Sequence, residues 1–134
     1  MVHRNHEPEP CQGPAWSLMR LVPVSRYIRT ALQGLELQVR LLGETLEQAE
    51  LAAYVAGPGP SSEYVPDGLA YNPRRTKAWH LGRVKYFYEA FRDGRAVDPI
   101  CVARGPAIGH FPAQGAHRVL GAHLAGIKRL AAED

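Results

Sequence analysis

The residues Gln-Gly-Ala-His-Arg at 114–118 combine the chemical groups that proteins use to bind a phosphate. Gly115 permits a tight turn directly before a predicted helix, whose first N–H groups and positive dipole end attract anions. We expect the backbone amides of Gly115, Ala116 and His117 to hold the phosphate. An exposed Arg118 would neutralise the charge of the phosphate, and His117 would act as a hydrogen-bond donor or general acid.

A second pair of cationic side chains, Arg74 and Arg75, follows the dipeptide Asn72-Pro73. Proline biases Asn72 towards an extended conformation, so the two arginines come just after a predicted turn. In one interpretation they clamp the same phosphate from across a pocket. In the other they are an ordinary solvated pair on the surface, and the residue types alone leave both interpretations open.

A long helix over residues 77–92 is predicted to position these groups. Thr76 is its expected N-cap, and Gly94 is placed just after its end. The apolar side chains at positions i, i+3, i+4 and i+7 predict a face turned to the core, made of Val84, Phe87, Tyr88 and Phe91. Arg83 and Lys85 are expected to lie away from this face.

Between this helix and the phosphate loop, the sequence predicts two strands. Residues 100–103 are consecutively apolar, which indicates a buried strand. Residues 108–112 would pair with it, and since Pro112 has no N–H to donate, this second strand would lie at an edge or end in a bulge. Cys101 is expected to be a buried core thiol, and no disulfide with Cys11 is expected.

The rest of the chain is predicted from the same kinds of pattern. Apolar side chains at helical spacing favour a helix after residue 118, with glycine and alanine residues that permit close packing. The remaining predicted elements are strands at 18–22, 35–41, 63–65 and 130–132, helices at 24–32 and 45–55, a helix C-cap at Gly34 and an irregular segment at 57–62.

The fold class predicted from these elements is α+β, with a short mixed sheet and packed helices. A chain of 134 residues is long enough for one substantial core. Residues 1–14 are expected to form a disordered tail and residues 61–134 the core. Residues 15–60 would be a strand-and-helix extension that packs on that core or on a second copy of the chain, which leaves a homodimer open.

The composition favours an anionic partner and argues against a membrane. The formal net charge is +3 and the isoelectric point is near 9.1, so the chain is mildly basic. No apolar run approaches the ~18 residues that span a bilayer, and a cytoplasmic location is expected. His3 and His6 lack the further ligands of a metal site, so no metal-ligating residues are predicted.

The order of these motifs resembles the ParB/sulfiredoxin-like superfamily. That family has an Asn-Pro-x-x-Arg-like box, a helix, a Pro-Ile-x-Val-Arg strand and a Gly-x-x-Arg or Gly-x-His-Arg loop in this order. This chain has Asn-Pro-Arg-Arg at 72–75, a predicted helix, Pro-Ile-Cys-Val at 99–102 and Gly-Ala-His-Arg at 115–118, and the resemblance covers about residues 63–132. Two positions depart from the family. Sulfiredoxins carry their reactive cysteine where this chain has Ala116, so the resemblance does not imply reduction of sulfinic acids. Gln114 replaces an aspartate that nuclease and amino-acid kinase relatives carry.

The resemblance implies a ParB-like protein that binds a nucleotide or a nucleic-acid phosphate, and hydrolysis of a nucleotide or phosphodiester stays open. A nucleotide with Mg²⁺ is the cofactor that such relatives would suggest. The alternative is a non-catalytic DNA-binding, partner-binding or assembly module that keeps the anion site. A free amino-acid kinase is a third reading, which Gln114 disfavours. Because no helix-turn-helix region follows the loop, any DNA binding is expected to be weak and independent of sequence.

Overall fold

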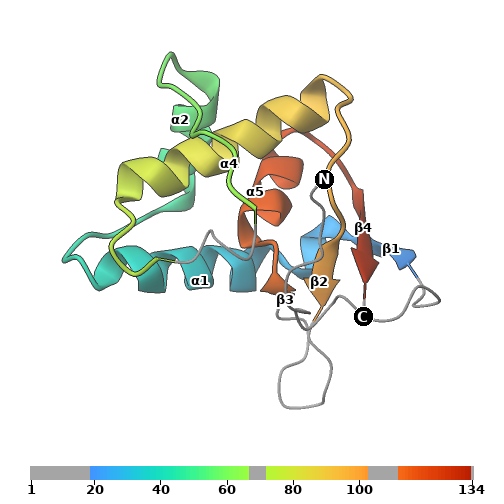
Figure 1. The fold of residues 1–134 in the computed structure, drawn as a ribbon, viewed down its shortest axis with the longest axis horizontal. Coiled ribbons are helices and arrows are strands. Elements are labelled where there is room, and N and C mark those ends of the chain that lie inside the picture. The colour runs from blue at the N-terminus through green and yellow to red at the C-terminus, as the bar shows by residue number, and fades with distance from the viewer. Residues whose placement is uncertain (1–18, 67–71, 103–111, 134) are drawn as a thin grey trace.

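The computed structural model of the protein describes residues 19–66, 72–102 and 112–133 (Figure 1). Along the chain its elements are β1 (Met19–Pro23), the 3-10 helix η1 (Val24–Arg26), α1 (Ile28–Arg40), α2 (Gln48–Ala56), α4 (Lys77–Arg92), β2 (Ile100–Val102), β3 (Pro112–Gln114), α5 (Ala116–Leu124) and β4 (Arg129–Glu133). Four helices and a small mixed sheet make the fold α+β, as predicted. The tail predicted at 1–14 lies outside the described residues.

The sheet has four strands in the order β1-β4-β2-β3. β4 is antiparallel to β1 and parallel to β2, while β3 pairs antiparallel with β2. β3 therefore lies at an edge, and the pairing is irregular between Cys101 and Val102, as the proline at its start suggested. Residues 108–111 of the predicted second strand lie outside the described residues.

α5 lies between α1 and α4 and packs against both (Figure 1). Its side chains Val119, Leu120 and Ala122 are almost fully buried. The contact with α4 is close because Gly121 has no side chain: a Cβ there would lie 2.8 Å from Phe87 Cβ and 2.8 Å from the backbone nitrogen of Tyr88. The small residues of α5 thus bring the backbones of the two helices together.

The predicted strand at 35–41 is wrong, because α1 runs unbroken through Gly34 and Leu35 to Arg40. The core contacts of this helix come from Ala31, Leu35 and Val39, which are spaced four residues apart and are at most 1% exposed. The alternation that suggested a strand depended on Leu37 and Leu41, which are 58% and 71% exposed. One exposed leucine on the outer side of α1 and another just after its end imitated the two-residue period of a strand.

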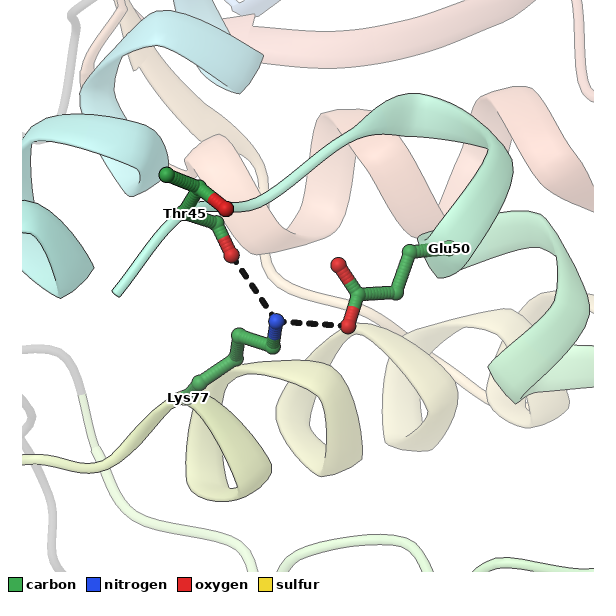
Figure 2. Close-up of polar contacts among 3 residues, drawn as sticks. All are labelled: Thr45, Glu50 and Lys77. Atoms are coloured by element: carbon green, nitrogen blue, oxygen red, sulfur yellow. Dashed lines mark hydrogen bonds and ion pairs between the residues drawn. The ribbon is translucent and has the colours of Figure 1, made fainter.

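α4 begins and ends where the sequence predicted. The Thr76 side chain accepts a hydrogen bond from the backbone N–H of Trp79 at 3.2 Å, and Gly94 has a φ of +72° just after the helix. The first turn is joined to the region before α2. Lys77 Nζ donates to the Thr45 carbonyl at 2.8 Å, and it also pairs with Glu50 in the first turn of α2 at 2.6 Å. Figure 2 shows the Lys77 side chain between these two partners.

The predicted positions of Arg83 and Lys85 are wrong, because both side chains are buried. Lys85 Nζ donates to the carbonyl oxygens of Gly57 and Gly59 at 2.6 and 2.5 Å. Both carbonyls belong to the irregular segment after α2, where no regular backbone hydrogen-bonding pattern satisfies them. Burial of the ammonium is thus compensated by the irregular segment at 57–62, which forms as predicted.

Three smaller predictions also fail. Residues 63–65 form no strand, and α2 starts at Gln48 rather than at 45. Cys101 is buried, as expected, but it is disulfide-bonded rather than a free thiol. Its only possible partner within the chain is Cys11, which lies outside the described residues. Distance along the sequence does not limit which cysteines a fold can join.

Gly121 is crowded and Gly34 is not, so alanine substitutions at these two glycines should have opposite effects on stability. Gly121→Ala should lower the free energy of unfolding by about 1–3 kcal/mol, because the two helix backbones must separate. Gly34→Ala is the control, since a Cβ at Gly34 meets no atom within 4 Å. It should raise the same free energy by about 0.5–1 kcal/mol. Urea denaturation measures both, and an unaffected Gly121→Ala variant would contradict the close crossing.

Candidate functional site

The turn before α5 requires glycine at position 115 for two reasons. Gly115 is the N-cap residue, with a φ of +115°, a conformation that other residues rarely adopt. A Cβ at this position would also lie 2.7 Å from Cγ2 of Ile100, which is buried in β2. The sequence-based expectation of a glycine turn directly before this helix is confirmed.

The N-terminus of α5 has the electrostatic character that an anion needs. The first N–H groups of an α-helix have no acceptor within the helix and carry the positive end of its dipole. The first turn holds no acidic side chain, and it carries His117 and Arg118. Gly115, Ala116 and His117 keep part of their surface accessible. The helix start therefore presents N–H donors and the positive end of the helix dipole to a ligand.

His117 forms a hydrogen bond that the sequence did not predict. Its Nε2 lies 2.9 Å from Nδ1 of His80 on α4, and the two imidazole planes are inclined by only 4°. Trp79 packs with its ring nearly perpendicular to both imidazoles, at centroid distances of 5.1 and 5.7 Å. Since one facing nitrogen must donate and the other accept, the hydrogen-bonded pair has at least one neutral ring.

Arg118 is 3% exposed, so the expectation of an exposed arginine at this position is wrong. Its guanidinium carbon lies 5.7 Å from the centroid of the Phe87 ring. The guanidinium also reaches back to the turn, because Nη2 would be 3.3 Å from a Cβ on Gly115. The close packing of α5 on α4 buries this charge between the aromatic side chain and the helix start.

Arg83 is a candidate site residue that the sequence reasoning missed. It is 3% exposed, and its guanidinium carbon lies 5.2 Å from the Phe87 ring centroid and 5.5 Å from that of Trp79. Nη1 donates a hydrogen bond of 2.8 Å to the carbonyl of Val65. The signal in the sequence was the spacing of Trp79, His80 and Arg83, which places all three on neighbouring turns of α4.

The structure separates the two arginines of the Asn-Pro box. The Arg75 guanidinium carbon lies 4.2 Å from the Trp79 ring centroid, and the charge of Arg75 acts on His80. Arg74 is exposed, and its backbone N–H donates to the Asn72 side chain at 2.9 Å, which closes a tight turn. Arg75 thus joins the groups around the helix start, whereas Arg74 faces solvent.

We call Arg75, Arg83, Arg118, His80 and His117 the cationic cluster. Burial lowers the pKa of His80 to about 4, with the charges of Arg75 and Arg83 acting in the same direction. The pKa of His117 is also lowered well below its usual value, first by burial and then by Arg83, His80 and Arg118. Both imidazoles are therefore neutral at pH 7, so His117 can donate or accept a hydrogen bond but is not an imidazolium acid there.

The cluster supplies guanidinium forks, a helix start and two neutral imidazoles, which suit a phosphate. A Mg²⁺ site would need carboxylate or other oxygen ligands. In residues 19–66, 72–102 and 112–133 no group of three or more histidine, cysteine, aspartate or glutamate side chains is arranged to hold a metal ion. The residues of the cationic cluster include no carboxylate, so the cluster itself does not fit Mg²⁺.

No protein-family model, curated protein or solved structure matches this chain. The likeness to the ParB/sulfiredoxin-like superfamily therefore stays a prediction from the order of its motifs. Within the described part of the chain, no helix has the length and apolar character needed to cross a membrane.

The lowered pKa of His80 predicts a loss of stability in acid. The unfolded chain binds a proton at this histidine below about pH 6.5, whereas the folded protein does so only near pH 4. The free energy of unfolding therefore has its full value above pH 6.5, where His80 is neutral in both states. It should decrease by roughly 3 kcal/mol as the pH falls to 4. Urea denaturation at several pH values measures it. His80→Gln should flatten the curve relative to the control His123→Gln, and parallel curves for the two variants would refute the assignment.

Proposed function

We propose that this protein binds a phosphate-bearing ligand, a nucleotide or a nucleic-acid phosphate, at the N-terminus of α5. The observation that carries the proposal is the convergence of three arginines on the hydrogen-bonded histidine pair beside Gly115. A guanidinium presents several donors in a fixed fork that matches phosphate oxygens. The amides of the first turn of α5 add donors on the same side as His117.

The burial of Arg83 and Arg118 supports the same proposal. Both guanidiniums rest against Phe87, so their positions are defined by packing rather than by solvent. A ligand then meets donors that are already ordered, which reduces the entropy lost on binding. The motif order shared with the ParB/sulfiredoxin-like superfamily is an independent argument from the sequence for a phosphate at this loop.

Hydrolysis of a nucleotide or phosphodiester is the finer form of the proposal. A neutral His117 can accept a proton from an attacking water, and guanidiniums stabilise charge on the phosphoryl oxygens. Binding without turnover, as in a DNA-binding or assembly module, is the second candidate. The observation that favours it is the lowered pKa of His117, because a neutral imidazole is not the cationic general acid that would protonate a leaving group.

The different positions of Arg74 and Arg75 provide a matched test of the site. Isothermal titration with CTP, ATP and ADP should show binding to the unmodified protein. Arg75→Met should weaken it about tenfold or more, because a charge-assisted hydrogen bond contributes about 1.5–3 kcal/mol. Arg74→Met should change the affinity by less than about threefold, since its side chain is exposed and screened.

Arg118→Lys extends the test without removing the buried charge. Lysine keeps the apolar stem and the positive charge but lacks the guanidinium fork, so nucleotide affinity should fall while the helical circular dichroism is unchanged. The proposed site would be wrong if both the Arg75→Met and Arg118→Lys proteins bound all three nucleotides as tightly as the unmodified protein does.

A further inference from the structure

The second ring nitrogen of His80, Nε2, is a buried polar atom within the cationic cluster. His80 is 1% exposed, and its Nε2 has no hydrogen-bond partner within residues 19–66, 72–102 and 112–133. Leaving a buried donor or acceptor unpaired costs about 1–3 kcal/mol. The buried Lys85, by contrast, donates to two carbonyl oxygens. His80 Nε2 instead lies in a ring that is influenced by the charges of Arg75 and Arg83. Such an atom calls for a physical explanation.

The hydrogen bond to His117 limits what His80 Nε2 can do. If His117 Nε2–H donates to His80 Nδ1, the remaining proton of the neutral His80 ring is on Nε2. If the donation runs the other way, Nε2 is an acceptor. An acceptor beside Arg75 and Arg83 offers nothing to an anion, whereas a donor completes a set of donors. A bound anion therefore selects the tautomer in which Nε2 carries the proton.

We propose that His80 contacts the ligand directly, with its Nε2–H donating to an oxygen of the bound phosphate, and that His117 is the positioning residue that fixes the tautomer of His80. The inference rests on the proposed phosphate site, and it changes the role that the sequence suggested for His117. The ligand class is a phosphate whose oxygen reaches the α4 side of the cluster, between the guanidiniums and the histidine pair. No covalent step is involved.

The charges around the pair fit this arrangement. His80 lies near Arg75 and Arg83, and His117 lies near Arg83 and Arg118, so guanidiniums from α4, from the turn before it and from α5 surround the two rings. Burial and these charges keep both rings neutral in the absence of ligand. An anion between the guanidiniums offsets their charges, so a proton on His80 becomes less costly when phosphate is bound.

Two amide substitutions separate the two nitrogens of His80. The side-chain amide of asparagine can take the place of Nδ1, so His80→Asn can keep the contact with His117 but loses the ligand contact. The amide of glutamine reaches the place of Nε2, so His80→Gln keeps a donor for the ligand.

Trp79 packs against both imidazoles, so its fluorescence reports on their environment. Trp16→Phe leaves Trp79 as the sole tryptophan of the chain.

The experiment titrates inorganic phosphate into the Trp16→Phe protein and its two His80 variants, with Trp79 fluorescence as the signal. We expect His80→Asn to weaken phosphate binding about tenfold or more and His80→Gln to weaken it less than about threefold. In the parent protein, the acid midpoint of Trp79 fluorescence should be near pH 4 without phosphate and higher with it. His80→Gln should show no such phosphate-dependent shift, because it has no imidazole to titrate at that position.

Equal losses in the two variants would overturn the inference, because they would make His80 a packing residue. Unchanged affinity in His80→Asn would overturn it as well. Both results would leave the proposed phosphate site intact. Failure of the parent protein to bind inorganic phosphate, CTP, ATP or ADP would overturn the phosphate site itself, and the role of His80 with it.

Discussion

The close contact between α4 and α5 at Gly121 determines how four groups of the cationic cluster lie relative to one another, namely His80, Arg83, His117 and Arg118. It brings the start of α5, with His117 and Arg118, against the face of α4 that carries His80 and Arg83. The second fixed point is Gly115, whose missing side chain lets the helix start touch Ile100 of β2. A side chain at either glycine would collide with these neighbours, so the arrangement of the site depends on the close contacts at Gly115 and Gly121.

The cluster is costly for the fold, which is one reason to connect it with function. Moving an ion from water into the protein interior costs several kcal/mol unless hydrogen bonds and charges compensate. Part of the compensation is visible in the hydrogen bond from Arg83 to the Val65 carbonyl and in the aromatic rings of Phe87 and Trp79. The histidines avoid the rest of the cost by staying neutral, and perturbed pKa values of this kind concentrate at functional sites.

The sequence predicted the elements whose ends are marked by particular residues. Thr76 and Gly94 define α4, and Gly115 marks the turn before α5, because caps and positive φ angles are local requirements. It failed where burial decides the structure. The leucines of α1 imitated a strand because period alone does not say which side chains meet the core.

Arg83 and His80 were missed for a related reason. Polar residues on a helix are expected to face solvent, and only the position of α5 shows that this side of α4 is covered. Arg118 was assigned to the site from its motif, but its burial depends on Phe87, a residue 31 positions earlier in the chain. Local sequence therefore predicted the glycine turn before α5, while the side chains that pack against this turn could be identified only from the tertiary structure.

The most direct test of the central claim is a crystal structure of the protein grown with tungstate, a phosphate analogue whose anomalous scattering identifies its position. We expect a tungstate peak in front of the first turn of α5, within hydrogen-bond distance of a backbone amide of residues 115–117 and of a nitrogen of Arg83 or Arg118. If tungstate binds only at other places, and the guanidiniums of the cationic cluster contact only protein groups, the proposed phosphate site is wrong.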